Sequence, residues 1–548
     1  MPYQEFKSCT DEVFKPRKIA GPDGAALYET ESGSLLHKII TRNDTALLKQ
    51  YITAWNFRRS GIPSTIIQSL DPFYTAAANG SLDALRVLLD AHHGNANSVS
   101  LEERGFSLLH VACQHAQIEI VEFLLDSQPP FAIVHGRDPG GWTPLMSAAY
   151  SIGTFGEGAD VHRARSEALV NMLLDRGASA KDKAPSSTVA REEQSVPQAE
   201  STVLGLAITG CSYEMVKRLL ERGVDRRERL RYHSDGPGFW DDGVDVHDVT
   251  PLHIGSRSWN VDGIRAILEY RHERGAKLLD LLFCRDSMNR VPLHWAAAGS
   301  DPEYEDSLPE DTLLKRINST FELLVPKDDR AAAKKLINAR DITGATPLHY
   351  PTQAHAGRGR KGSNHAYHAI QWLCSRGADA SATDHRMQTV LHKLAYSSLD
   401  GEPIDLDLIN LLLSHGCPLD AKDEHGETPL HILARHLRQA HAAVMLIKCG
   451  AKVDVMNNRG NLPLHEATRG AMRPSLSWDG QRQEPVSLSD RINAQDKVVE
   501  ALLDAQGTDS SLDQPNREGK TPRQLIEETR RRWEEMEARS LRVGRSSD

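Results

Sequence analysis

Short runs of apolar residues recur along most of this 548-residue chain, and each run has the spacing of a helix. In residues 85–94, 170–178 and 409–416, apolar positions fall three and four residues apart, and a glycine stands at or near the end. This spacing gathers the apolar side chains on one helix face. The glycine suits a left-handed C-cap. Each run therefore predicts a short amphipathic helix with one buried face.

A second pattern precedes these runs: a four-residue anchor typified by Thr428-Pro429-Leu430-His431. The anchors, some of them degenerate, begin at residues 34, 71, 107, 143, 202, 250, 291, 346, 389, 428, 462 and 521. Threonine or serine can cap a helix through its side-chain oxygen. Proline suits the first helical position, because its missing N–H would be unpaired there. Each unit is therefore predicted to be two antiparallel helices that bury their apolar faces by stacking on neighbouring units.

The anchor T-P-L-H-x-A, followed by V-x-x-L-L-x-x-G-A, resembles the ankyrin repeat. The likeness extends over about residues 34–541 and about twelve copies. It implies an all-α ankyrin-repeat solenoid of stacked helix-turn-helix units with β-turn fingers, such as residues 423–427. It also implies that the inner helices and fingers line a concave face.

The repeats divide the chain into three parts. Residues 1–33 fit no repeat, residues 34–516 form the array, and residues 517–548 hold a degenerate repeat and a charged helix. In that last helix, Leu525, Thr529, Trp533 and Met536 are predicted to form one packed face, as a terminal cap requires. Insertions that break the repeat spacing lie at residues 151–162, 181–200, 226–247, 300–315, 354–365 and 470–494.

Composition narrows the functional classes. The formal net charge is −10, which argues against direct binding to nucleic acid. No apolar run reaches the roughly 18 residues that span a bilayer, so no membrane partner is expected. The seven cysteines include no C-x-x-C pair, and the first residues show no apolar signal-peptide core. These features predict a cytoplasmic or nuclear protein.

Three sequence stretches imitate catalytic or cofactor sites. Gly357, Gly359 and Gly362 have dinucleotide-motif spacing, but no strand precedes them as that motif requires. His355, His365 and His368 lie close together without a nearby carboxylate or a free cysteine to complete a zinc site. His465-Glu466 begins a zinc motif whose second histidine is replaced by Arg469. We therefore predict no catalytic residue, no metal and no cofactor.

The anchor histidines receive a structural interpretation from the resemblance. They would bond to neighbouring backbone and hold a finger against a helix. Those at anchor positions are His37, His110, His253, His294, His349, His392, His431 and His465.

The resemblance also suggests where a partner binds. The residue before each anchor is expected to point toward the concave face. These residues are Leu70, Phe106, Trp142, Val249, Arg290, Ala345, Gln388, Glu427, Asn461 and Lys520. The first three come from consecutive units and, with Tyr150, could form one apolar patch; large aromatics are frequent interface anchors. Phe239 and Trp240, in the 226–247 insertion, are a second candidate.

The resulting prediction is a non-catalytic scaffold or adaptor that binds a protein or peptide on the concave face. The alternatives are a regulatory subunit of an enzyme complex, and an enzyme with its site in an insertion.

Overall fold

The structure is a computed structural model that divides the chain into two compact units. It describes residues 18–20, 26–28, 34–54, 71–93, 107–127, 132–153, 159–184, 201–232, 246–270, 277–299, 309–355, 365–398, 403–472, 486–507 and 509–544. The first unit comprises Met1–Thr154, Gly158–Ala207 and Glu221–Val224. The second comprises Phe155–Glu157, Ile208–Leu220 and Asp225–Asp548.

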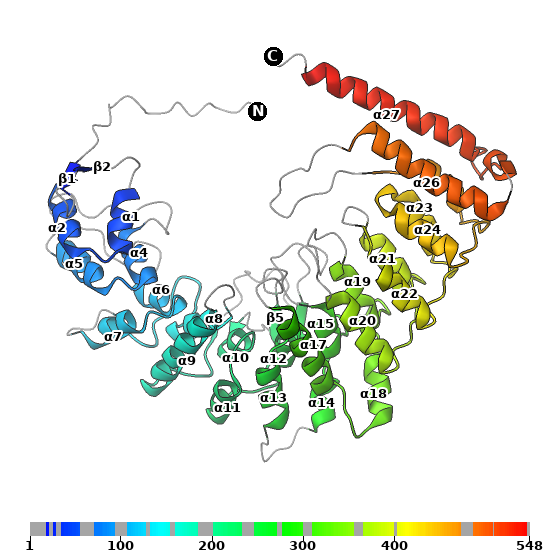
Figure 1. Ribbon diagram of the computed structural model, residues 1–548. Helices are drawn as coiled ribbons and strands as arrows, with labels where there is room; N and C mark the ends of the chain where they lie inside the picture. The colour runs from blue at the N-terminus through cyan, green and yellow to red at the C-terminus, as the bar shows by residue number, and fades with distance from the viewer. Residues whose placement is uncertain are drawn as a thin grey trace, which may run out of the picture. The chain divides into compact units, whose positions relative to one another are not determined.

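In the first unit, an inner and an outer helix alternate, and helices of the same kind stack on one another (Figure 1). Its helices are α1 (Ser34–Thr41), α2 (Thr45–Ala54), α4 (Pro72–Asn79), α5 (Leu82–His93), α6 (Leu108–Gln114), α7 (Ile118–Asp126), α8 (Pro144–Ser151), α9 (Ala159–Asp175) and α10 (Val203–Ala207). The inner helices α1, α4, α6, α8 and α10 pack in that order.

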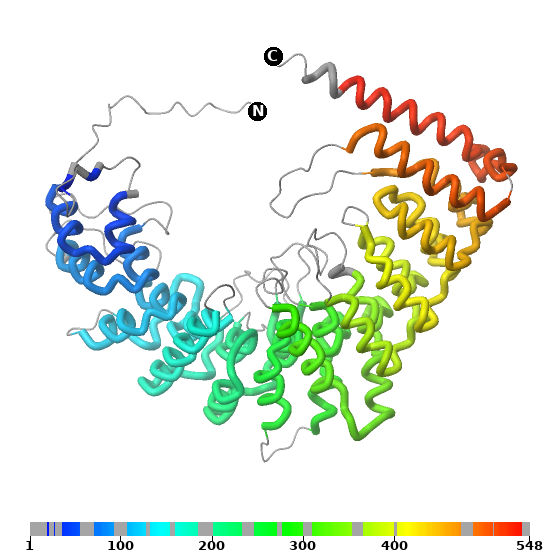
Figure 2. The backbone as a smooth tube through the Cα atoms, in the orientation of Figure 1, coloured from blue at the N-terminus to red at the C-terminus, as the bar shows by residue number. Residues whose placement is uncertain are grey.

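The second unit repeats this arrangement, and its paired helices can be followed in the tube of Figure 2. The inner helices are α12 (Pro251–Arg257), α15 (Pro292–Ala298), α19 (Tyr350–His355) with the preceding 3-10 turn η3 (Pro347–His349), α21 (Val390–Ser397), α23 (Pro429–Arg435), α25 (Pro463–Thr468) and α27 (Pro522–Gly544). The outer helices are α13 (Val261–Glu269), α17 (Glu310–Leu324), α20 (His365–Ser375), α22 (Leu406–Ser414), α24 (Ala440–Lys448) and α26 (Leu488–Gln506). The further helical segments are α11 (Tyr213–Glu221, whose last residue belongs to the first unit), α14 (Leu278–Leu282), α18 (Arg330–Ile337), η4 (Leu437–Gln439) and η5 (Asp509–Asp513).

The strands of the described residues form three short antiparallel pairs. They are β1 (Lys18–Ala20) with β2 (Ala26–Tyr28), β3 (Lys183–Ala184) with β4 (Ser201–Thr202), and β5 (Leu230–Tyr232) with β6 (Val246–Val249). β1 packs on α2, so the segment before the first repeat contributes a small hairpin to the first unit. The other two pairs lie in and directly beside the predicted insertions 181–200 and 226–247. Each pair lengthens a finger.

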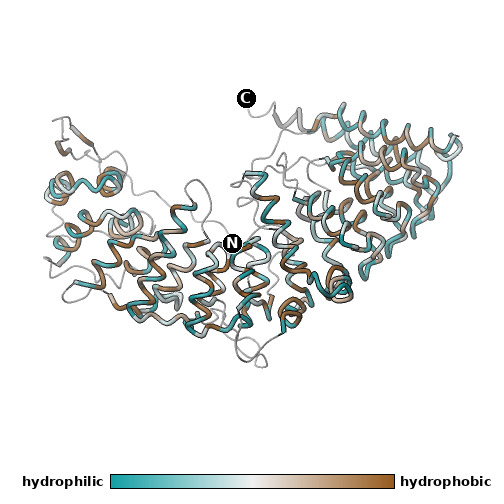
Figure 3. Tube along the Cα trace, turned by 60° about the horizontal axis from the view of Figure 1, so that its bottom comes forward, coloured by the Kyte–Doolittle hydropathy of each residue, from teal (hydrophilic) through white to brown (hydrophobic). Residues whose placement is uncertain are grey.

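Hydrophobic burial between stacked helices holds each unit together. Apolar and polar residues are interspersed along the helices (Figure 3). The apolar positions of the stacked helices are buried, as Phe73, Leu145 and Phe321 illustrate, each with no exposed surface. Burying such a side chain contributes about 1.5–3 kcal/mol relative to leaving it in water. A helix pair cannot obtain this burial alone, so the neighbouring repeat completes it.

Helix ends follow the signals in the sequence, as α4 shows. The Asp71 side chain accepts from the N–H of Phe73 at 2.9 Å, and Pro72 occupies the first turn. Gly80, at φ 74°, ends the helix in the left-handed conformation.

At the anchors the principal cap differs from the prediction, because the histidine ring rather than the threonine hydroxyl makes the shorter bond. The N–H of Thr389 donates to Nδ1 of His392 at 3.1 Å, whereas the N–H of His392 reaches the Thr389 hydroxyl at 3.5 Å. The same threonine-to-histidine bond occurs at Thr250, Thr346 and Thr428. A nitrogen that accepts an N–H bond carries no proton, so the proton lies on Nε2.

In six of the eight anchor histidines, Nε2 bonds to a backbone carbonyl of the following repeat, as the resemblance implied; His37 instead contacts the Thr75 hydroxyl, and Nε2 of His349 has no hydrogen-bond partner among the described residues. His392 Nε2 lies 3.1 Å from the carbonyl oxygen of Glu427, and His431 Nε2 lies 3.1 Å from that of Asn461. His110, His253, His294 and His465 make the equivalent bond. These anchor histidines therefore hold a finger of the following repeat and are not free to act on a substrate.

Basic side chains join neighbouring fingers in a second way. The Arg340 guanidinium donates to the carbonyl oxygen of Gly344 at 2.9 Å in its own finger, and to that of Thr383 at 2.6 Å in the next. Arg285 donates in the same manner to the carbonyl oxygens of Asn289 and Arg340.

Replacing Arg340 with alanine should lower the free energy of unfolding by about 1–2 kcal/mol, since charged donors make the stronger hydrogen bonds but this site is exposed. Urea unfolding followed by far-UV circular dichroism measures the change. Lys334→Ala, an exposed substitution on α18 that removes the same charge, is the control and should have no measurable effect. Equal effects of the two variants would refute the finger-linking role.

In the last helix, α27, three of the four residues predicted to form one packed face are buried. Leu525, Thr529 and Trp533 are buried and face α25 and α26. The prediction for Met536 is wrong: its side chain is 52% exposed. The packed face ends one turn earlier because α25, the helix beneath, stops at Thr468.

Candidate functional site

The fingers of the second unit share one hydrogen-bonding pattern that fixes their tips. Asp384 Oδ1 accepts from the backbone N–H groups of Arg386 at 2.9 Å and Gln388 at 2.8 Å. Asp423 and Asn457 accept from residues two and four positions later in the same way. In each of these fingers, the residue two positions after the Asp or Asn is therefore held at the tip.

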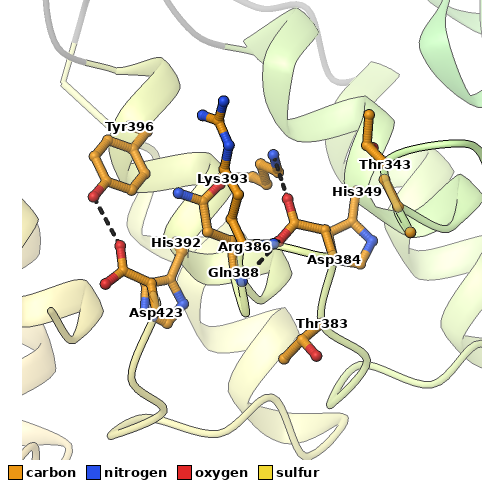
Figure 4. A network of polar contacts seen from close by, with 12 residues as sticks. Thr343, His349, Thr383, Asp384, Arg386, Gln388, His392, Lys393, Tyr396 and Asp423 are labelled. Atoms are coloured by element: carbon orange, nitrogen blue, oxygen red, sulfur yellow. Dashed lines mark hydrogen bonds and ion pairs between the residues drawn. The ribbon is translucent and has the colours of Figure 1, made fainter. Parts of the chain in front are cut away.

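The second carboxylate oxygen of two of these aspartates binds a side chain of α21 (Figure 4). Asp384 lies 2.7 Å from the Lys393 ammonium, and the Tyr396 hydroxyl donates to Asp423 at 2.9 Å. Burial raises the pKa of Asp384, but the bond and charge of Lys393 outweigh burial, so the net pKa lies below its usual value. Burial, reinforced by Glu427 and Asp423, raises the pKa of Tyr396, which keeps this hydroxyl protonated as a donor.

Two adjoining cavities open between the finger tips and the inner helices. The first, of about 370 Å³, is lined by Arg386, Gln388, Lys393, Tyr396, Ser397, Glu424 and His425. The second, of about 310 Å³, is lined by Tyr396, His425, Glu427, Arg435, Asn457, Asn458 and Arg459. Tyr396 and His425 border both, so they form the wall between neighbouring cavities. We call the two cavities together the finger groove.

An ion-pair network lies beside the second cavity. Arg435 pairs with Glu427 and, at 2.7 Å, with Glu466. Asn461 donates to Glu466 at 2.8 Å, and Tyr396 donates to Glu427 at 3.2 Å. Burial raises the pKa of Glu466, but the charge of Arg435 and these hydrogen bonds outweigh it, so the net pKa is lowered. Glu466 is therefore ionised, and both carboxylates beside the groove are already supplied with donors.

The tips above the groove are exposed and largely basic. The Arg386 and His425 side chains are 71% and 68% exposed, and Arg459 is exposed in the next repeat. In Figure 4 the side chains of Tyr396 and Lys393 point toward Asp423 and Asp384, and the Arg386 side chain lies between these two pairs. We call Arg386, His425 and Arg459 the basic stripe. The sequence analysis did not identify it, although each of these residues lies two positions after the Asp or Asn that orders its finger.

In the first unit, two of the predicted partner-binding residues come together. The rings of Trp142 and Tyr150 pack edge to face with centroids 5.6 Å apart, and Tyr150 is 48% exposed. Asp138 positions Trp142 by accepting its backbone N–H at 2.8 Å. The other predicted residues, Leu70, Phe106, Phe239 and Trp240, lie outside the described residues.

The residue before each anchor, expected to point toward the concave face, is buried in most of the described repeats, although Gln388 and Glu427 line the finger groove. The buried ones are Val249, Arg290, Ala345, Gln388, Glu427 and Asn461. Their polar side chains turn toward internal partners: Arg290 pairs with Asp286 at 2.6 Å, and Glu427 pairs with Arg435. Trp142 and Lys520 remain partly exposed.

The glycines and histidines that imitate cofactor or metal sites lie partly within and partly outside the described residues. Gly357, Gly359 and Gly362 lie outside the described residues, as does the side chain of His355. His365 is buried with its ring 5.0 Å from that of Trp259. Over the residues that the structure describes, no three His, Cys, Asp or Glu side chains are grouped to hold a metal. Within the same residues, no helix is both long and apolar enough to cross a membrane.

Comparison with known proteins identifies the repeats. A family model described as ankyrin repeats (3 copies) matches residues 36–133, 73–184 and 360–457. The chain is 23% identical over 466 residues to the E3 ubiquitin-protein ligase KEG of Arabidopsis thaliana, covering 84% of this chain and 22% of the relative. It is 26% identical over 183 residues to human transient receptor potential cation channel subfamily A member 1, covering 33% and 13%. It is also 26% identical over 186 residues to mouse inversin, covering 34% and 14%.

The chain thus spans less than a quarter of the length of these relatives, whose activities remain their own. Ankyrin repeats are typically non-catalytic and indicate a protein-interaction domain. The family match, the stacked helix pairs and the histidine links lead to one conclusion. Residues 36–184 and 360–457 of this chain are ankyrin repeats, and the described residues have an all-α solenoid fold.

Proposed function

We propose that this protein is a non-catalytic scaffold or adaptor that binds a protein or peptide on the face formed by finger tips and inner helices. The observation that carries this proposal is the finger groove. Its two cavities lie between repeats, as expected for a surface that a solenoid builds from equivalent positions. The polar side chains beneath it are tied to one another, which keeps its shape fixed before a partner arrives.

Position-specific cross-linking tests the proposal. A photoreactive phenylalanine replaces His425, at the wall of the groove, or Lys448, at the exposed end of outer helix α24. We expect the probe at position 425 to capture one protein reproducibly from native extract, and the probe at position 448 not to capture it. Identical capture from both positions would refute binding at the groove.

The Trp142–Tyr150 pair is a second proposed contact within the same function. Aromatic side chains of this kind often carry a large part of an interface's binding energy. Trp142→Ala should weaken capture of a partner by about 1 kcal/mol or more without changing thermal unfolding. Ile133→Ala, which removes an exposed apolar side chain elsewhere in the first unit, is the control. Unchanged capture by a folded Trp142 variant would remove the pair from the proposal.

A cytoplasmic or nuclear location is part of the proposal. The six described cysteines are free, which suits a reducing compartment. Direct binding to nucleic acid is not part of it, because the net charge is −10.

A further inference from the structure

We propose that the finger groove binds an extended acidic peptide whose carboxylate side chains are three residues apart. This inference rests on the proposed function and adds the chemistry of the partner. Its basis is the register of basic residues at the finger tips.

Three successive fingers carry a basic residue at the same position, two after the aspartate or asparagine that orders the turn: Arg386, His425 and Arg459. The equivalent residues of the fingers on either side are Thr343 and Glu518. The basic stripe thus begins and ends with the finger groove. Two guanidinium groups, with an imidazole between them at the same register, favour a ligand of negative charge.

The two guanidinium groups at the finger tips remain available to a ligand. No carboxylate hydrogen-bonds or pairs with the Arg459 guanidinium among the described residues, and the Arg386 guanidinium makes only a long ion pair with Glu424 at 3.7 Å, beyond hydrogen-bond distance. Guanidinium groups in this situation bind carboxylates strongly, often with two parallel bonds.

The carboxylates of the groove are in the opposite situation. Glu427 accepts from Arg435, Tyr396 and Asn457, and Glu466 accepts from Arg435, Asn457 and Asn461. Both are buried, so a cationic ligand would have to break existing bonds to reach them. Glu424, 44% exposed, is the acidic side chain of the lining that a ligand meets at the surface.

The spacing of the repeats sets the spacing of the peptide's charges. Neighbouring inner helices pack about 8–10 Å apart, and the two cavities belong to successive repeats. In a fully extended strand, side chains three residues apart point to opposite faces. In the extended polyproline II conformation, three residues complete one turn and advance about 9 Å, so side chains three apart share one face. Side chains three apart can therefore enter the first and second cavities, with the peptide crossing the Tyr396–His425 wall.

Fluorescence anisotropy with the full chain tests the inference. The probe is a labelled peptide of glycine and serine with two aspartates three apart. The comparison peptides place the aspartates side by side, replace them with asparagine, or replace them with lysine. We expect the first peptide to bind at least about fivefold more tightly than each of the others, and its affinity to fall as salt is raised.

Protein variants locate the binding. Arg386→Gln combined with Arg459→Gln should weaken binding of the spaced peptide about tenfold, since two exposed charge pairs with the peptide are lost. Lys448→Gln combined with Lys452→Gln changes the net charge equally at exposed positions outside the groove and should leave the affinity unchanged.

Several results would overturn the inference: equal binding of the asparagine peptide, preference for the lysine peptide, or insensitivity to the double arginine change. Equal affinity for adjacent and spaced aspartates would overturn the spacing rule. Equal affinity for a single-stranded oligonucleotide would mean a general polyanion site instead. If position 425 still cross-links a protein while the acidic peptide fails, the peptide chemistry is wrong and the proposed function stands.

Discussion

Acidification from pH 7 to pH 4 is expected to destabilise the second unit steeply, because three buried anchor histidines must stay neutral in the fold. Burial lowers the pKa values of His253, His294 and His349 to about 4. In the unfolded chain each would titrate near about 6.5. Between these values the unfolded state binds more protons, so the free energy of unfolding falls as pH falls.

The size of the effect follows from the pKa difference. The stabilisation from each histidine is fully present above about pH 6.5 and is lost by about pH 4, amounting to about 3 kcal/mol each. Three such losses are comparable with the whole stability of a typical domain, about 5–15 kcal/mol. Urea titrations at pH 7.5, 6 and 5 should show midpoints that decrease progressively.

One repeat of the chain has glutamine in place of the anchor histidine. This residue can keep the capping hydrogen bond but does not titrate. In the last repeat Gln524 stands at the histidine position, and its Oε1 accepts the N–H of Thr521 at 3.1 Å. His349→Gln should therefore retain the cap while removing one titrating group and its share of the pH dependence. His385→Gln, an exposed finger-tip change, is the matched control. An unchanged pH dependence in the His349 variant would contradict the assignment.

Replacing Arg435 with methionine should destabilise the second unit by about 3–5 kcal/mol at pH 7, since it leaves Glu427 and Glu466 without their cation. Both carboxylates are buried, and methionine restores little more than the apolar stem. Differential scanning calorimetry or urea unfolding measures the loss.

Two comparisons make this prediction specific. Arg459→Met removes an exposed arginine that has no carboxylate partner among the described residues, and should have little effect on stability. Glu466→Gln in the Arg435→Met background should recover part of the loss, because one buried charge is removed. The deficit should also shrink toward pH 5, since Glu466 without Arg435 has a higher pKa and can be protonated. If the loss of stability is the same with Glu466→Gln and at pH 5, then lost packing, not uncompensated charge, is responsible.

Much of the fold could be predicted from local sequence because each anchor encodes its own structure. Proline after the cap residue, the apolar spacing and the terminal glycine act over a few residues, and the helix pair α23–α24 begins and ends close to these signals. The family resemblance anticipated the bond from an anchor histidine to the next repeat. The count of about twelve repeats and the part boundaries remain predictions.

The predicted partner surface was harder to obtain, since exposure at one position depends on the neighbouring repeat. Trp142 and Gln388 occupy the same place before an anchor, yet Trp142 is partly exposed and Gln388 is buried. Glu427 likewise turns inward because Arg435 lies eight residues later on the adjoining helix. No local pattern states which of these side chains finds an internal partner.

The sequence by itself determined that this protein is a stack of paired helices, since cap, proline, apolar stripe and glycine are short-range signals that repeat in order. Only the tertiary structure decided which polar residues a ligand can meet. Arg386, His425 and Arg459 are separated by more than 30 residues at each step in the chain, and stacking of the fingers brings them into one stripe. The same stacking pairs Glu427 and Glu466 with Arg435. Packing between repeats therefore buries these carboxylates and leaves the basic side chains of the groove accessible to a ligand.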